Sequence, residues 1–81
     1  MSVFSEKFQE YVTGANIKIA ALSKLSGVER SFIQKMLTGE RIPIDPAVLQ
    51  PLAATLMLTP NQKRILTEAY SITKMGEATY Y

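Results

Sequence analysis

Residues 19–43 read IAALSKLSGVERSFIQKMLTGERIP and predict two short helices joined by a tight turn. Gly27 lies four residues after Ser23, and Gly39 lies six residues after Ile33. The small side chain of Ser23 lets a second helix cross close to the first. Gly27 can adopt a positive φ without a Cβ penalty, so the chain can turn sharply there. Gly39 can end the second helix in the same way.

The second of these helices has two different faces. Val28 and Ile33 are apolar and are expected to point into a core. At 3.6 residues per turn, four polar residues fall on the opposite side, namely Arg30, Ser31, Gln34 and Lys35. One anchored apolar face and one free polar face suit a helix-turn-helix, whose second helix enters the DNA major groove.

These residues resemble the lambda-repressor/Cro-like helix-turn-helix domains, often called XRE-type regulators. The matching positions are Leu22-Ser23, Ser26-Gly27-Val28, Ile33 and Gly39-Glu40-Arg41-Ile42-Pro43. The last group is similar to the family's G-x-R-x-P loop after the recognition helix. The resemblance covers residues 3–74. The chain departs from the family at Ser23, where Ala is usual, and at Ile19, where the family often has a Gln that clamps a DNA phosphate.

The polar face supplies the candidates for reading bases. Arg30 can pair with guanine or with a phosphate, and Gln34 can pair with adenine. Lys35 can reach a base edge or a phosphate, and Ser31 is small enough to let the helix approach the bases. The alternative for Arg30 and Gln34 is an ordinary solvated surface position, and the alternative for Ser31 is simply a residue that suits the first turn of a helix.

A second set is expected to contact the DNA backbone and so set the register of binding. Its members are Lys18, Lys24, Glu29, Thr38 and Arg41. The resemblance implies the backbone contact for Arg41. Glu29 can instead accept from a cytosine amino group or cap the helix, and Lys24 is equally well explained as an exposed lysine.

Composition bounds the class of protein. The chain has 81 residues, 47% hydrophobic and 20% charged, which predicts one globular domain. It has no cysteine and no histidine, so disulfides, thiol nucleophiles and imidazole bases are excluded. The four glycines are scattered singly, so they form no glycine-rich phosphate-binding loop. Glu6 and Glu10 lie beside Lys7 and resemble a solvated surface, not a catalytic acid–base pair. We therefore predict no enzymatic activity, no cofactor and no metal site.

The charge and the ends of the chain give weaker signals. The net charge is +2, but residues 17–41 contain five basic and two acidic residues. This modest patch fits a DNA-binding domain, and it equally fits an ordinary solvated face. No apolar run approaches the ~20 residues of a membrane span, and the N-terminus lacks the features of a signal peptide. We expect a cytoplasmic protein without a membrane partner.

The rest of the chain predicts three further helices, giving an all-α, compact bundle of five short helices with the helix-turn-helix at helices 2 and 3. Helix 2 spans about residues 18–26 and helix 3 about 30–38, with Glu29 at or near its cap. The apolar positions of the first helix are Phe4, Phe8, Tyr11 and Val12, with Ser2 as cap and Gly14 as stop. Met36, Leu37, Ile42 and Ile44 are expected to be core or loop anchors.

The fourth and fifth helices have clear start signals. Asp45-Pro46 begins the fourth, whose apolar positions are Val48, Leu49, Leu52, Leu56 and Met57. Pro51 predicts either a kink there or a late start. Thr59-Pro60-Asn61-Gln62 forms a capping box at the start of the fifth. Its apolar positions are Ile65, Leu66, Ala69, Tyr70, Ile72 and Met75, and Gly76 is expected to end or interrupt it.

These signals place a helix-turn-helix DNA-binding domain at residues 1–76 and a tail at 77–81, which can be the start of a linker to the effector domain of a longer regulator. We predict sequence-specific binding of double-stranded DNA as a homodimer, in a prokaryotic or phage transcriptional regulator of repressor type. The dimer contact is assigned to Ile72, Met75 or the terminal tyrosines, which can instead pack on the core. The rival prediction is a protein-interaction module of antitoxin or adaptor type on the same fold.

Overall fold

The computed structural model describes residues 2–80, with side chains described for residues 2–76. Within this part of the chain all regular structure is helical. The elements are α1 (Val3–Ala15), α2 (Ile19–Ser26), α3 (Arg30–Thr38), the 3₁₀-helix η1 (Pro46–Val48), α4 (Leu49–Thr55) and α5 (Pro60–Tyr80). The all-α prediction with five α-helices is confirmed, and the predicted bounds of helices 2 and 3 hold within one residue.

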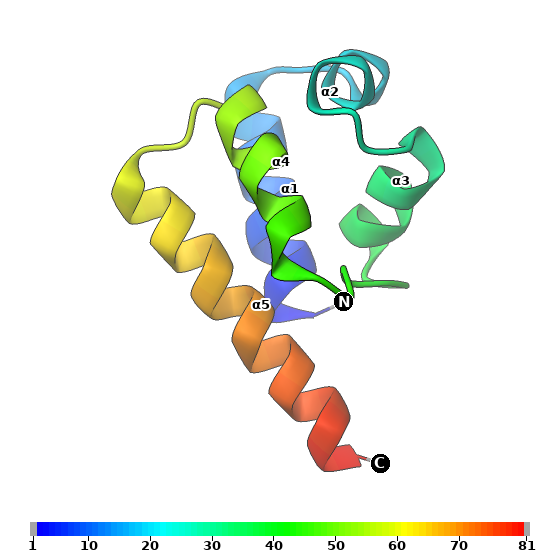
Figure 1. The fold of residues 1–81 in the computed structure, drawn as a ribbon, viewed down its shortest axis with the longest axis vertical. Helices are drawn as coiled ribbons and strands as arrows, with labels where there is room; N and C mark the ends of the chain where they lie inside the picture. The colour runs from blue at the N-terminus through cyan, green and yellow to red at the C-terminus, as the bar shows by residue number, and fades with distance from the viewer. Residues whose placement is uncertain (1, 81) are drawn as a thin grey trace.

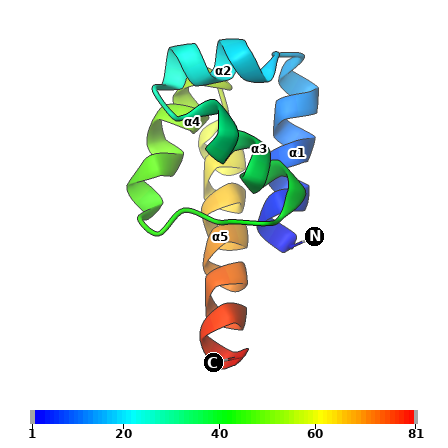
Figure 2. The ribbon, with the colours of Figure 1, turned by 90° about the vertical axis from the view of Figure 1, so that its right-hand side faces the viewer.

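The helices are arranged around one core (Figures 1 and 2). The first helix, α1, packs against α3 and α5, and α2 packs against α3 and α4. In Figure 2, α2 lies across one end of the molecule, and the C-terminal half of α5 extends beyond the other helices at the opposite end. The connection from α3 to η1 crosses the face between these ends, in front of α5.

Every helix contributes apolar side chains to the core. The Phe4 and Phe8 rings stack at a centroid distance of 5.7 Å, and the Tyr70 ring meets Phe4 edge-on at 6.0 Å. The other core members are Val12, Leu22, Ile33, Met36, Leu49, Leu52, Leu56 and Leu66. Burial of these side chains removes apolar surface from water, which is the main favourable contribution to folding.

Side-chain caps fix the starts of three helices. Those of α1 and α5 are as predicted, whereas Asp45, which was predicted to begin the fourth helix, caps the separate 3₁₀-helix η1. The Ser2 hydroxyl accepts from the Ser5 backbone N–H at 3.1 Å, and Asp45 accepts from the Ala47 N–H at 2.9 Å. Thr59 and Gln62 form the reciprocal bonds of a capping box, at 3.1 and 3.0 Å. These bonds satisfy backbone donors that a helix start leaves without partners.

The late start at Pro51 is also confirmed. Residues 46–48 form a separate 3₁₀ turn, and α4 begins at Leu49. Pro51 therefore lies in the first turn of α4. Its missing N–H costs nothing at that position, because first-turn amides have no partner within the helix.

Two predicted helix ends are wrong. The first helix continues past Gly14 to Ala15, and Asn16 forms the left-handed cap at φ 54°. The fifth helix continues through Gly76 to Tyr80, so the predicted tail begins as helix. Glycine disfavours a helix interior by only about 1 kcal/mol, and neighbouring helix-forming residues outweigh that cost at both sites.

Several apolar residues that were predicted to face inward are exposed. Ile44 is 88% exposed in the connection after α3, so it is not an anchor. Met57 is 86% exposed, because it occupies the left-handed position (φ 55°) that ends α4. Ile72, for which the sequence left open a dimer contact or packing on the core, is 57% exposed on α5 and does not belong to the core.

Candidate nucleic-acid interface

The connection between α2 and α3 is three residues long and is held by internal hydrogen bonds. Gly27 has φ 77°, as predicted, and its N–H donates to the Ser23 carbonyl at 2.9 Å. The Ser23 hydroxyl donates to the Val28 carbonyl at 2.6 Å. The small residue at position 23 therefore fixes the turn by a hydrogen bond, in addition to leaving room for α3.

The outer face of α3 carries a row of polar side chains. Ser31, Gln34, Lys35 and Thr38 are spaced three and four apart, and together with Glu40 they line one shallow depression of about 280 Å³. Ile33 and Met36 on the opposite face of the helix are fully buried. The structure thus brings together three of the four predicted base-reading residues; Arg30 is exposed at the first position of α3 but does not line this depression.

Two hydroxyls on this face are already engaged. The Ser31 hydroxyl donates to the Glu29 carboxylate at 3.0 Å. The Thr38 hydroxyl donates to the Lys35 carbonyl at 3.1 Å, and its oxygen accepts from the Glu40 N–H at 3.4 Å. Glu29 occupies the N-cap position of α3, as predicted, but its side chain makes no capping bond to the helix amides. The negative charge of Glu29 still interacts favourably with the positive end of the α3 helix dipole.

Arg41 lies beside this row. It lines a second depression, of about 240 Å³, with Glu29, Ser31, Phe32 and Lys35. The Arg41 backbone N–H donates to the Lys35 carbonyl at 3.2 Å and so ties the connection to the end of α3. This depression joins the predicted backbone-contacting residues Glu29 and Arg41 to the predicted base-reading residues Ser31 and Lys35.

The two remaining lysines belong to α2. Lys18 is the N-cap residue of α2 and provides no side-chain cap, so the amides of the first turn lack a side-chain partner. Lys24 lies in the last turn, where a positive charge complements the helix dipole. Both lysines are exposed, and neither lines the depressions beside α3.

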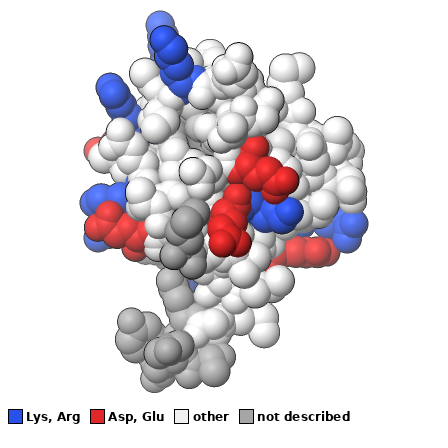
Figure 3. All heavy atoms as spheres, turned by 180° about the vertical axis from the view of Figure 1, so that it is seen from behind, with Lys and Arg blue, Asp and Glu red and all other residues white. Residues whose placement is uncertain are grey.

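The charge of the site is mixed. Around the two depressions, Arg30, Lys35 and Arg41 are offset by Glu29 and Glu40. Figure 3 shows the face opposite to that of Figure 1, where basic and acidic side chains are interspersed and no wide area of one sign is visible. The electrostatic attraction that the α3 site offers to a polyanion is local and modest, because its three basic residues are accompanied by two acidic ones.

An apolar hollow next to the site was missed by the sequence analysis. It has a volume of about 470 Å³, and its apolar lining residues are Phe32, Ile42, Ile44 and Val48. Glu40, Arg41 and Asp45 form its polar rim. The sequence does not reveal this hollow, because the residue type of Ile44 suggests a buried anchor, whereas the exposure of its side chain depends on contacts with the distant α5.

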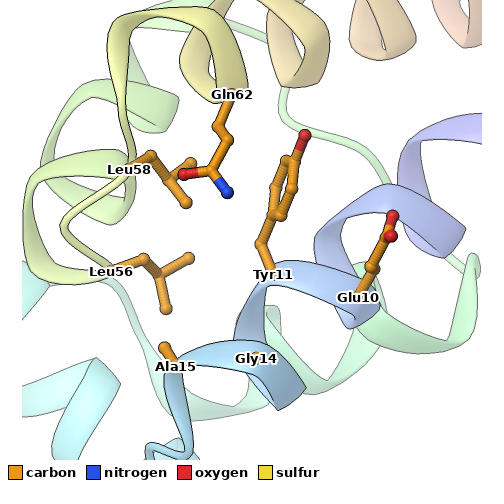
Figure 4. Close-up of a pocket in the computed structure, with 7 residues that line it drawn as sticks. All are labelled: Glu10, Tyr11, Gly14, Ala15, Leu56, Leu58 and Gln62. Carbon is orange, nitrogen blue, oxygen red and sulfur yellow. The ribbon is translucent and has the colours of Figure 1, made fainter.

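A further hollow lies between α1 and the start of α5 (Figure 4). In this view Tyr11 and Gln62 face each other across it, with Leu56 and Leu58 along one side. Glu10 also lines it and forms an exposed ion pair with Lys7 at 3.1 Å, and this hydrogen bond raises the pKa of Lys7 above its ordinary value. The lining groups offer hydrogen bonds, but they do not form a paired acid and base.

Residues 2–80 contain no helix with the length and apolar character that crossing a membrane requires. Among the described side chains, those of residues 2–76, Asp and Glu form no group of three that could hold a metal ion.

Comparisons with protein-family models, with curated proteins and with solved structures found no significant match to this chain.

Proposed function

We propose that this protein binds double-stranded DNA in a sequence-specific manner, with α3 in the major groove. The observation that carries the proposal is the outer face of α3, where Ser31, Gln34, Lys35 and Thr38 form a continuous polar row. The row lies on a helix whose other face is locked into the core by Ile33 and Met36. A rigid helix with hydrogen-bonding groups along its exposed side suits the pattern of donors and acceptors in the major groove.

The flanking residues suit contacts to the sugar-phosphate backbone. Arg41 lies next to the α3 row, and its guanidinium can pair with a phosphate. At the start of α2, amides without a side-chain cap lie next to Lys18, a combination that favours an anion. In this arrangement the backbone contacts set the register, and α3 discriminates between sequences.

The proposed molecule is a homodimer that acts as a transcriptional regulator of repressor type. One modestly charged domain gains affinity and specificity when two copies bind half-sites about 34 Å apart on DNA with two-fold symmetry. The proposed contact is on the C-terminal half of α5, where Ile72 is 57% exposed just before the helix extends beyond the others. The terminal tyrosines, also considered for this contact, lie outside the residues with described side chains.

The alternative is a protein-interaction module, and one observation favours it. The apolar hollow formed by Phe32, Ile42, Ile44 and Val48 lies beside α3, and Ile44 is 88% exposed. An exposed isoleucine next to an apolar hollow suits a protein partner better than a phosphate backbone.

The deciding experiment is a selection from random duplex DNA, followed by binding of the selected sequence over a range of salt concentrations. We expect a motif with two-fold symmetry, and an affinity that falls steeply as salt rises, because bound phosphates release counterions. The slope counts the phosphate contacts. Failure to enrich any motif, together with weak binding that is insensitive to salt, would refute the proposal and favour the protein-interaction alternative.

A further inference from the structure

Arg41 lies in a connection that is tied down on both sides. On the N-terminal side, its own N–H donates to the Lys35 carbonyl at 3.2 Å. On the C-terminal side, two residues on, Pro43 is fully buried. Between these two anchors the chain has no regular secondary structure, so the position of Arg41 depends on how firmly each anchor holds.

The C-terminal anchor is supplied by α5. The Tyr70 hydroxyl lies 2.7 Å from the Pro43 carbonyl and 3.1 Å from the Ile44 carbonyl. The Lys74 Nζ donates to the Ile44 carbonyl at 2.6 Å and to the Tyr70 hydroxyl oxygen at 3.2 Å. The same ammonium group lies 5.5 Å from the centre of the Tyr70 ring. We call this arrangement of two side chains on two successive carbonyls the α5 clamp.

The clamp is more than a packing contact. The Tyr70 ring is held in the core against Phe4, so its hydroxyl is presented at a fixed place. A hydroxyl that accepts from an ammonium group becomes a stronger donor, which strengthens its bond to the buried Pro43 carbonyl. One residue after Pro43, the Ile44 side chain is left in solvent although its carbonyl has two partners. The clamp therefore acts on the path of the backbone.

We infer that Tyr70 and Lys74 are positioning residues for DNA binding, which hold the connection so that Arg41 meets a backbone phosphate. The inference rests on the proposed function. Without the clamp, Arg41 would still carry its charge, but the segment after it would have to be ordered at the moment of binding. Ordering the segment on binding lowers the affinity for DNA, because its entropy cost then reduces the binding free energy instead of being met when the protein folds.

The test compares DNA affinity and its salt dependence in variants that remove the clamp without touching Arg41. Tyr70→Phe removes only the hydroxyl, and Lys74→Met removes the ammonium group. Lys63→Met removes the same charge from an exposed site in the first turn of α5 and serves as the matched control. Lys74→Arg keeps a donor at the carbonyl. All variants are measured well below their melting temperatures, so that lower stability does not appear as lower affinity.

We expect Tyr70→Phe and Lys74→Met to bind the selected DNA about 3- to 10-fold more weakly, with a salt slope smaller by about one phosphate contact. Lys74→Arg should recover most of the affinity, and Lys63→Met should keep the wild-type slope. Adding Tyr70→Phe to Arg41→Ala should weaken binding little beyond Arg41→Ala alone, because both changes remove the same contact. A merely structural role for Tyr70 would leave the salt slope unchanged.

Failure of the positioning inference and failure of the proposed function give different results. If the wild-type protein binds DNA and Tyr70→Phe matches it in affinity and slope, the positioning inference is overturned while the proposed function stands. Effects of Tyr70→Phe and Arg41→Ala that multiply fully would overturn it equally. If the wild-type protein does not bind DNA, the proposed function fails, and the inference falls with it. Faster amide exchange at Ile42, Ile44 and Asp45 in free Tyr70→Phe would then still identify the clamp as the anchor of this connection.

Discussion

The polar side chains on the outer face of α3 differ in their freedom to meet a ligand. The Ser31 hydroxyl is bonded to Glu29, and the Thr38 hydroxyl is bonded to the backbone at the end of α3. Among the described residues, the side chains of Arg30, Gln34 and Lys35 have no intramolecular hydrogen-bond partner. These three can bind a ligand without first breaking a bond within the protein, so they should contribute most to sequence preference.

Substitution on α3 tests this ranking. We expect Lys35→Ala and Arg30→Ala each to cost about 1–3 kcal/mol in binding of the selected DNA, if each residue contacts a base. Ser31→Ala should cost less, because its hydroxyl is engaged with Glu29. Titration of labelled duplex DNA measures all three, and Lys63→Ala on the exposed start of α5 controls for net charge. Wild-type affinity in a variant would remove that residue from the site.

Met57 offers a test of backbone strain. It has φ 55°, and the N–H groups of Met57 and Leu58 donate to the Ala54 and Ala53 carbonyls, each at 3.1 Å. This is the Schellman geometry that normally uses glycine. We expect Met57→Gly to raise the free energy of unfolding by about 0.5–1 kcal/mol, because relief of the left-handed strain exceeds the added entropy of glycine.

Urea denaturation measures the effect of Met57→Gly. Ala54→Gly is the matched control, since Ala54 is an exposed helical residue of α4, where glycine should cost about 1 kcal/mol. Equal destabilisation by both changes would show that the φ of residue 57 is not strained.

At the scale of the element, substitution of Gly27 tests the backbone conformation of the turn between α2 and α3, and Gly14 in α1 provides the matched control. A Cβ added at Gly27 or at Gly14 would meet nothing within 4 Å, but Gly27 has φ 77° and Gly14 lies within α1. We expect Gly27→Ala to lower the free energy of unfolding by about 1–2 kcal/mol through backbone strain. Gly14→Ala should raise it by about 0.5–1 kcal/mol. Thermal unfolding of both variants gives the two signs, and the same sign for both would contradict this account.

Helix starts could be predicted from the sequence because they depend on residues close together in the chain. Thr59 and Gln62 are three residues apart, and Asp45 bonds to the amide two residues on. Helix ends were predicted less well. Gly14 predicts a stop, whereas Asn16 supplies the left-handed cap. A single helical glycine is only weakly unfavourable, so the helices run on through Gly14 and Gly76.

Part of the candidate site could likewise be predicted from the sequence, and part could not. The polar row of α3 follows from helical periodicity, and its members do lie together. The exposure of Ile44 does not follow, because the carbonyls at positions 43 and 44 are held by side chains 26 to 30 residues away. Tyr70 gave the one available hint: a tyrosine on the apolar stripe of a helix usually finds a partner for its hydroxyl, but the sequence does not say which.

At the scale of the whole molecule, α5 has two surroundings. Its first half is packed on α1, with Leu66, Ala69 and Tyr70 buried, and its second half extends beyond the other helices (Figure 1). Ile72 lies where the helix leaves the core and is 57% exposed. An apolar side chain on a projecting helix suits a contact with a second copy of the chain.

The dimer contact can be tested at Ile72. We expect Ile72→Glu to raise the dimer dissociation constant at least about tenfold. The substitution removes the ~1.5–3 kcal/mol that burial of the isoleucine side chain contributes, and it places a charge in the interface. Ser71→Glu places the same charge on the adjacent exposed position and should change it little. Sedimentation velocity over a range of concentrations measures both. Identical dissociation constants for Ile72→Glu and the wild type would place the contact elsewhere.

The pairing of α1 with α5 also governs when the protein can fold during its synthesis. The Phe4 N–H donates to the Thr73 hydroxyl across 69 positions of the sequence, and the Phe4 ring meets Tyr70. A nascent chain that has not yet reached Leu66 therefore lacks the α5 contacts of Phe4 and leaves the aromatic face of its first helix only partly packed. Long-range contacts of this kind form late and leave apolar surface open to aggregation until they do. We expect ribosome-bound chains halted before α5 to remain accessible to proteases over their whole length.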